Sequence, residues 1–402
     1  MLDIALLGLM AYGFVQVVPL PGFVLDMVSP SDPAVRAAMA LEPPPASGWL
    51  PLSIDPWATA WASLVAAGAI ALFFGARATF AYGGVRRTAR GISAIGLVAS
   101  FVAVAQAATA GRLIYWRYPT EYEGPLPFGP FVNRNHFATW VIMAAPVCLG
   151  YLLAQAAKVE RADASILSRR TRFARMADGR RLWLTAAGAV MICALLLSLS
   201  RSGIVSLGAA TLAGALMFRQ RVASARGWWL VAAVAITIGL GIGQANLPAL
   251  ADRFTRSGSG VGNRIRIWRD TVPIISDFWL TGTGEGTYRT SMLYYQRGER
   301  EVQFNQAHNH YLQAISEGGL IAFGLFGCAV VAFVRIVRER VKVDGSAVYW
   351  IRAGAATGLM AAALQSLWET GLTMPANAAL ASVLAAIAVH ERAHSEKSIF
   401  RD

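Results

Sequence analysis

The chain has 402 residues, of which 55% are hydrophobic and 15% charged, and its mean hydropathy is +0.47. This composition excludes an ordinary soluble enzyme and indicates a polytopic membrane protein. The formal net charge of +13 needs no nucleic-acid partner, because arginine and lysine excess on one side is what membrane topology produces.

Apolar stretches long enough to cross a membrane recur along the whole chain. A helix needs about 20 mostly apolar residues to span ~30 Å of hydrocarbon. In chain order these stretches lie near residues 2–20, 57–76, 91–113, 136–157, 182–200, 203–218, 228–246, 309–334, 350–371 and 375–390. The sequence therefore predicts an all-α, polytopic membrane protein with about ten transmembrane helices.

The basic residues predict the orientation. With the N-terminus inside, most of the 36 arginines and lysines fall in inside segments, as the positive-inside rule requires. Lys158, Lys342 and Lys397 are all inside, so every outside basic residue is an arginine. The rigid guanidinium fork suits bidentate phosphate binding.

Three long outer segments lie between these spans, near residues 21–56, 112–134 and 247–307. The longest, 247–307, contains "NRIRIWRDTVPII", which predicts a short amphipathic helix, and "TGTGEGTY", a glycine loop able to approach a ligand with bare backbone. We expect one membrane domain over residues 1–402, with the 247–307 loop forming a small outer cap.

The stretch "QAHNHYLQAISEGGL" puts a polar cluster at the entry of an apolar segment. With a helix beginning near Asn309, four residues share one helix face: Asn309, His310, Gln313 and Glu317. His308 then lies at or before the first turn, facing water, where a neutral histidine can act as a general base. The alternative is that the polar stripe only seals contacts between helices, although ionisable groups in membrane segments are usually functional.

Outer arginines are candidates for binding an anion. Arg201, in "SLSRSG", lies in a tight turn between two apolar stretches, where it either extends to the interface or binds an anion. Arg264, Arg266 and Arg269 form either a solvated face or part of a site. Together with a histidine base, such arginines suit attack on a diphosphate-linked donor, because they stabilise the charge on the leaving group.

Other catalytic patterns are weak or missing. "HERAH", His390 to His394, matches a zinc-protease pattern but lacks a convincing third ligand, and "EYE", Glu121 to Glu123, has no accompanying Asp-x-Asp. The sequence contains no Walker loop and no G-x-S-x-G motif, which disfavours an ATP-driven pump and a serine hydrolase. We therefore predict neither a metal nor a cofactor.

Several motifs together resemble a known family. "FVNRNHFATW", "SRSG", "NRIRIW", "LTGTGEGTY" and "HNHYLQAISEGGLIAFGLFG", in this order, are similar to the O-antigen ligase and polymerase family of bacterial inner membranes. The matching motifs span residues 131–327. The resemblance implies a metal-independent, inverting glycosyltransferase of the C type, which takes a glycan from undecaprenyl diphosphate on the periplasmic side.

The resemblance also implies roles for individual residues. His308 matches the catalytic base, and Arg201 and Arg264 match the diphosphate-binding arginines, with Arg266 as a further candidate. Residues in supporting positions are Asn309, His310, Gln313, Glu317, Arg134 and Asn135. The expected acceptor is the lipid A core, and the 247–307 loop is expected to be periplasmic.

Two alternatives stay open at this point. The first is an O-antigen or exopolysaccharide polymerase of the same family, whose acceptor is a growing glycan. The second is a transporter of a small solute such as inorganic carbon, in which the polar stripe would line a pathway. A transporter needs polar residues through the depth of the membrane, whereas here they concentrate on the outer side.

Overall fold

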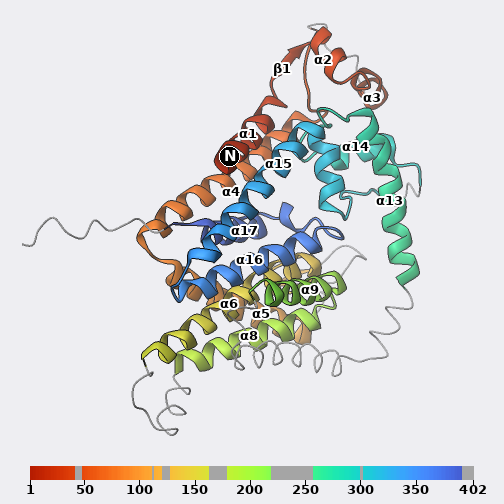
Figure 1. The fold of residues 1–402 in the computed structure, drawn as a ribbon. Helices are drawn as coiled ribbons and strands as arrows, with labels where there is room; N and C mark the ends of the chain where they lie inside the picture. Colours follow the sequence, from red (N-terminus) through yellow and green to blue (C-terminus); the bar gives the residue numbers. More distant parts are fainter. Residues whose placement is uncertain are drawn as a thin grey trace, which may run out of the picture. The chain divides into compact units, whose positions relative to one another are not determined.

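The computed structural model describes residues 1–40, 48–110, 113–119, 127–162, 179–218, 257–298 and 302–391, without the side chains of 157–162, 180 and 257–261 (Figure 1). Within these ranges the regular secondary structure is helical apart from two short antiparallel hairpins and an isolated β-bridge between Phe128 and Phe131, which confirms the all-α fold. The hairpins are β1 (Pro19–Pro21) with β2 (Trp49–Pro51), and β3 (Leu113–Ile114) with β4 (Tyr118–Pro119).

Among the described residues, four helices are long and apolar enough to cross a membrane: α4 (Pro56–Tyr82), α5 (Val85–Thr109), α6 (Arg134–Ala162) and α15 (His310–Val343). Four shorter helices are also apolar: α1 (Leu2–Val15), α8 (Gly179–Leu197), α9 (Arg201–Met217) and α17 (Pro375–Val389). The predicted span at 228–246 lies outside the described residues. The predicted span at 350–371 ends earlier than expected, because α16 (Val348–Gln365) stops before the short 3-10 helix η1 (Gly371–Thr373).

The contacts group the chain into two compact units. Unit 1 contains Met1–Ala71, Asn246–Arg335 and Gln365–Ala378, and unit 2 contains Leu72–Ala245, Ile336–Leu364 and Ala379–Asp402. This grouping does not test the expectation of one membrane domain over residues 1–402, which stays a prediction. Each unit is described below by itself.

Unit 1 includes a helical cap with its own apolar core. Its helices are α2 (Gly22–Val28), α3 (Asp32–Met39), α13 (Ser257–Asp277) and α14 (Tyr288–Tyr295). Apolar residues three or four positions apart on α13 face inward, and the core buries Ile267, Ile274, Phe278, Tyr288 and Met292. The predicted amphipathic helix in the 247–307 loop is therefore present and longer than expected.

Unit 1 also contains a helix with a break. Gly319 in α15 has φ 61° and ψ −165°, and the loop that follows α13 fills the gap. Backbone amides bond across the break, from Leu320 to the carbonyl of Trp279 at 2.8 Å and from Gly284 to the carbonyl of Glu317 at 2.9 Å. These bonds satisfy backbone groups that an interrupted helix would leave unpaired.

The glycine loop therefore has a different role from the one that the sequence indicated. A side chain on Gly282 would collide with the carbonyl of Glu317, and one on Gly319 would collide with the carbonyl of Leu280. Protein backbone, rather than space for a ligand, lies against these two glycines. Their small size is needed for the break in α15.

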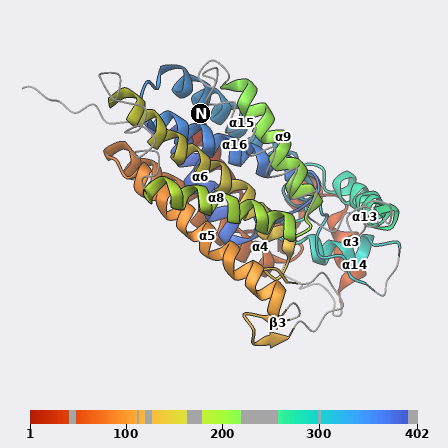
Figure 2. The same cartoon turned by 90° about the horizontal axis from the view of Figure 1, so that it is seen from below.

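Unit 2 is built from closely packed helices. Helices α5, α6 and α8 pack against one another and α9 packs against α6 (Figure 2). Every residue of α6 from His136 to Cys148 is buried. Glycines permit close backbone approach between α6 and α16, since a side chain on Gly150 would meet the carbonyl of Trp350 and one on Gly354 the carbonyl of Pro146.

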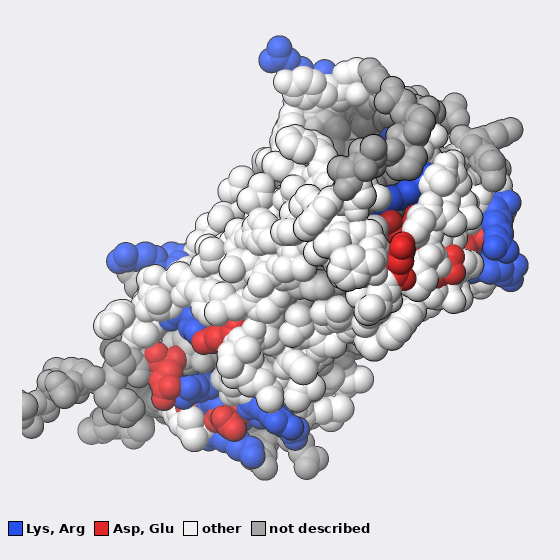
Figure 3. All heavy atoms as spheres, turned by 90° about the horizontal axis from the view of Figure 1, so that it is seen from above, with Lys and Arg blue, Asp and Glu red and all other residues white. Residues whose placement is uncertain are grey.

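Charged side chains are sparse on the surface. On the face shown in Figure 3, Lys, Arg, Asp and Glu form small groups and most of the remaining described surface is uncharged. Large apolar side chains such as Trp57, Leu64, Val98 and Phe101 are exposed on α4 and α5. Exposed apolar helix faces of this kind are typical of contact with lipid.

Candidate functional site

The polar entry to α15 is an N-terminal cap preceded by a constrained histidine. The side-chain oxygen of Asn309 accepts hydrogen bonds from the amides of Tyr311 (3.0 Å) and Leu312 (3.1 Å), as a helix cap does. His308, just before this cap, has φ 49°, in the left-handed region. Such a conformation costs about 1–2 kcal/mol for a residue other than glycine, so surrounding contacts must hold it.

Those contacts bring His308 into a cluster of three charged or polar residues. Oε2 of Glu369 lies 3.4 Å from Nδ1 of His308, and Oε1 of Glu369 accepts a hydrogen bond from Nη2 of Arg264 at 3.0 Å. The Glu369 side chain is 1% exposed, whereas those of His308 and Arg264 are 33% and 27% exposed. A buried carboxylate thus orients two side chains that reach the surface, where they can meet a substrate.

A tryptophan explains why these three residues meet. Trp268 follows Arg264 by one turn of α13, and its indole nitrogen donates to the carbonyl of Ala307 at 2.9 Å. Its ring also packs against that of Trp368, with centroids 5.9 Å apart. His308 follows Ala307 in the sequence, and Glu369 follows Trp368. The contacts of Trp268 therefore bring both residues close to Arg264.

The rest of the predicted polar stripe supports the segment before His308. Gln313 accepts from the amide of Ala307 at 3.1 Å and donates to Glu317 at 3.2 Å, and Glu317 also accepts from the amide of Tyr288 at 3.0 Å. The amide of His310 bonds to the carbonyl of Ser366 at 2.8 Å, close to Glu369 in sequence. The stripe thus ties the entry of α15 to α14 and to the segment that follows α16.

Burial also changes the acid–base properties of two groups in the loop and helix beside α15. Burial raises the pKa of the Tyr288 hydroxyl above its ordinary range, although a hydrogen bond with Thr271 at 2.7 Å acts in the opposite direction. Burial likewise raises the pKa of the Glu285 carboxyl, against a weak opposing hydrogen bond from Ser63 at 3.4 Å. Neither group contacts His308 in the described contacts.

Arg266 has a different environment from Arg264. Its Nη2 donates to the side-chain oxygen of Asn263 at 2.6 Å, on an exposed part of α13. The two arginines are two residues apart, so they point to different sides of the helix. The structure therefore brings Arg264, but not Arg266, to Glu369.

The remaining candidates lie in unit 2, where two helices begin side by side. Arg134 is the first residue of α6 and Arg201 the first residue of α9. A side chain on Gly203 in the first turn of α9 would lie 2.9 Å from Cβ of Ala138 in α6. Two adjacent helix N-termini, each starting with an arginine, form an environment that favours an anion.

Asn135 and the residue before Arg201 belong to the same region. Asn135 follows Arg134, and its backbone amide donates a hydrogen bond to Oδ1 of Asn133 at 2.8 Å, which helps start α6. Ser200 is the N-cap residue of α9, and its hydroxyl is buried with no hydrogen-bond partner among the described residues. The first turn of α9 therefore has no side-chain cap from Ser200.

A comparison with protein-family models finds a match for this chain. Residues 186–327 match the family model described as O-antigen ligase. The resemblance to the O-antigen ligase family is confirmed. No match was found among curated proteins. The family match indicates an enzyme for glycosyl transfer of the O-antigen ligase or polymerase type, in a membrane protein.

The region that matches the O-antigen ligase family contains Arg201, Arg264 and His308, whereas Arg134 and Glu369 lie outside it. Sequence reasoning missed Glu369. A signal was present in "LWET", where an ionisable residue ends an apolar stretch, since such residues are usually functional. Only the fold, however, brings it to His308, 61 residues away in sequence.

Two residues of the H-E-x-x-H pattern, His390 and Glu391, lie within the described residues. Glu391 forms an ion pair with Arg340 at 2.6 Å, and Nδ1 of His390 donates to the carbonyl of Ile387 at 2.8 Å. His394 lies outside the described residues. Within them, His390 and Glu391 thus serve the end of α17 and its neighbour α15.

Proposed function

We propose that the chain transfers a glycan from undecaprenyl diphosphate to an acceptor hydroxyl at the periplasmic face of the bacterial inner membrane, with the lipid A core as acceptor. The O-antigen ligase family match over residues 186–327 supports the reaction type. The observation that carries the proposal is the carboxylate of Glu369, shared by His308 and Arg264. It holds a base and a phosphate-binding group in one cluster.

In this proposal His308 is the general base. The Glu369 carboxylate accepts the Nδ1 proton of the neutral ring, which leaves the lone pair of Nε2 for the acceptor hydroxyl. As the acceptor oxygen bonds to the anomeric carbon, its proton passes to Nε2. Glu369 then stabilises the imidazolium that forms.

Arginine stabilises the other side of the reaction. The bond from the anomeric carbon to the diphosphate oxygen breaks, and the diphosphate leaves with the bonding electrons. Arg264 commits one described N–H to Glu369 and has further donors for phosphate oxygens. The resemblance assigns Arg201 to the diphosphate as well. A single displacement of this kind inverts the anomeric carbon and does not require a metal ion.

The proposal is tested with a variant that lacks the general base but keeps the fold. His308→Asn is the sharpest variant, because asparagine tolerates the left-handed conformation better than alanine but cannot accept the proton. We expect glycan transfer from the lipid-linked donor to lipid A core by purified protein to fall by about 10²–10⁴-fold, with unchanged thermal unfolding. Transfer at the wild-type rate would exclude His308 as the base.

A second variant tests the shared carboxylate. Glu369→Gln keeps the size of the side chain but removes the charge that orients His308, so kcat should fall by roughly 10–100-fold with a smaller change in KM. A variant that changes KM alone would show that Glu369 only binds substrate.

The acceptor is tested with the wild-type protein. Transfer of glycan onto lipid-linked repeats, with none onto lipid A core, would favour the polymerase alternative.

A further inference from the structure

An exposed tryptophan lies beside the cluster of His308, Arg264 and Glu369. Trp368 directly precedes Glu369 in the segment that follows α16, and all of these residues belong to unit 1. Trp368 is 41% exposed, whereas the Glu369 side chain is 1% exposed. A large aromatic side chain that stays half in water next to polar groups is suited to contact with a ligand.

The indole ring of Trp368 is held in place by the protein. It packs against the ring of Trp268, with centroids 5.9 Å apart and the planes 39° from parallel. Trp268 is itself fixed by its bond to the carbonyl of Ala307 at 2.9 Å, and the backbone amide of Trp368 donates to the carbonyl of Gln365 at 2.8 Å. A ligand that packs on Trp368 therefore meets a ring that loses little conformational entropy on binding.

The two tryptophans differ in the use of their indole N–H groups. That of Trp268 is committed to Ala307, whereas that of Trp368 has no hydrogen-bond partner among the described residues. Trp368 thus offers an apolar ring face together with a donor at the ring edge. A sugar matches this combination, because its ring has a face of C–H groups and an edge of hydroxyls.

The segment that contains Trp368 runs beside the segment that carries the proposed base. Residues 366–370 contact residues 306–310 at three points: the amide of His310 donates to the carbonyl of Ser366 at 2.8 Å, the hydroxyl of Thr370 donates to Oε1 of Gln306 at 2.7 Å, and Glu369 lies 3.4 Å from His308. The acceptor hydroxyl must come within hydrogen-bond reach of His308. The sugar that carries this hydroxyl therefore lies next to the segment of Trp368.

Membrane lipid is the other partner that an exposed tryptophan can have. The side chains of His308 and Arg264 are 33% and 27% exposed in the same cluster. Lipid over this surface would cover both polar side chains without offering them hydrogen bonds, which is costly. A sugar supplies such bonds through its hydroxyls, so the surface favours a sugar.

We propose that Trp368, held by Trp268, binds the terminal sugar of the acceptor. The C–H face of the sugar packs on the indole ring, and a sugar hydroxyl accepts the indole N–H. This inference rests on the proposed function, because the acceptor is the substrate whose hydroxyl reaches His308. Trp368 contacts none of the reacting atoms in this proposal, so it sets the affinity for the acceptor rather than the rate of the chemical step.

Three variants separate binding by the indole ring from its packing on Trp268. Trp368→Ala removes the whole ring. Trp368→Phe keeps an aromatic face and the packing on Trp268 but lacks the N–H donor. The matched control is Trp279→Ala in the same unit, because Trp279 is 54% exposed and bonds to α15 through its backbone carbonyl, which the substitution keeps.

The first experiment measures binding without catalysis. The oligosaccharide of the lipid A core is titrated into the purified protein in the absence of donor, and the Kd is measured by calorimetry. The Kd should rise about tenfold for Trp368→Ala and about threefold for Trp368→Phe, and stay unchanged for Trp279→Ala. A Kd that is the same for Trp368→Ala and wild type, or no binding by the wild type, overturns the proposal.

The second experiment measures glycan transfer and distinguishes the acceptor from the donor. Trp368→Phe should raise the KM for the lipid A core about threefold, and leave kcat and the KM for the lipid-linked donor unchanged. An increase in the donor KM, or a loss confined to kcat, overturns the proposal. Binding of the oligosaccharide that depends on Trp368, without any transfer of glycan to the lipid A core, would contradict the proposed function alone.

Discussion

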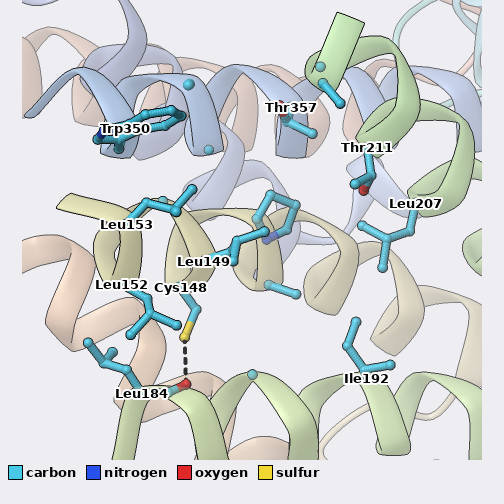
Figure 4. A pocket seen from close by; sticks show the side chains of 18 of the residues that line it. Cys148, Leu149, Leu152, Leu153, Leu184, Ile192, Leu207, Thr211, Trp350 and Thr357 are labelled. Atoms are coloured by element: carbon cyan, nitrogen blue, oxygen red, sulfur yellow. Dashed lines mark hydrogen bonds between the residues drawn. The ribbon is translucent and has the colours of Figure 1, made fainter. Parts of the chain in front are cut away.

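The two units stabilise their apolar helices by different contacts. In unit 1, the break in α15 is bound by backbone amides of a neighbouring loop, and Gln16 donates to the carbonyls of Thr281 and Glu317 at 3.0 and 3.1 Å. In unit 2, α6 and α16 approach through glycines and apolar side chains. Directional hydrogen bonds hold a polar site in one geometry, whereas non-directional apolar packing can leave a cavity between helices (Figure 4).

The largest effect is expected at the break in unit 1. Gly319 has a backbone conformation that is essentially limited to glycine, and a side chain there would collide with the carbonyl of Leu280. Gly319→Ala should therefore lower the stability of the solubilised protein by about 3 kcal/mol or more and abolish transfer, as measured by thermal unfolding and activity.

The matched control is Gly324→Ala on the same helix, where a Cβ would meet nothing within 4 Å. This variant should be as stable as wild type or slightly more stable, because alanine is the better helix former. Equal stability of the two variants would contradict the role assigned to the break.

A smaller effect is expected in unit 2. Gly354→Ala places a methyl group against the carbonyl of Pro146, so α6 and α16 must separate slightly, at a cost of about 1–3 kcal/mol. Gly208→Ala, with open space at Cβ, should cost nothing. If Gly354→Ala destabilises as much as Gly319→Ala, the contrast between the units is wrong.

The smallest effect concerns the pH dependence of unit 1. Because burial raises the pKa of Glu285, the folded state favours the protonated carboxyl, and this contribution to stability is lost as the pH rises through the folded-state pKa. Glu285→Gln stays neutral, so its melting temperature should exceed that of wild type by a few degrees at high pH and converge with it on acidification. Glu339→Gln, at an exposed position on α15, is the control. A difference in melting temperature that does not vary with pH would contradict this account.

Local sequence patterns predicted much of the architecture. Apolar length predicted most of the described helices, and the "HNHYLQAISEGGL" pattern predicted the helix start to within one residue, because capping and helical spacing depend on near neighbours. The helix lengths and the helix start can be predicted without contacts between residues far apart in the sequence. The motif order also predicted the resemblance to the O-antigen ligase family, which the match over residues 186–327 supports.

Local patterns in the sequence thus indicated a helical membrane protein, its resemblance to the O-antigen ligase family, and the residues His308, Arg201 and Arg264 as candidates. Only the tertiary structure showed that Glu369 lies beside His308 and Arg264, that the glycine loop fills a broken helix, and that unit 2 contains a cavity. These features depend on residues far apart in sequence. Burial, collision and ion pairing act through space, so no local pattern specifies them.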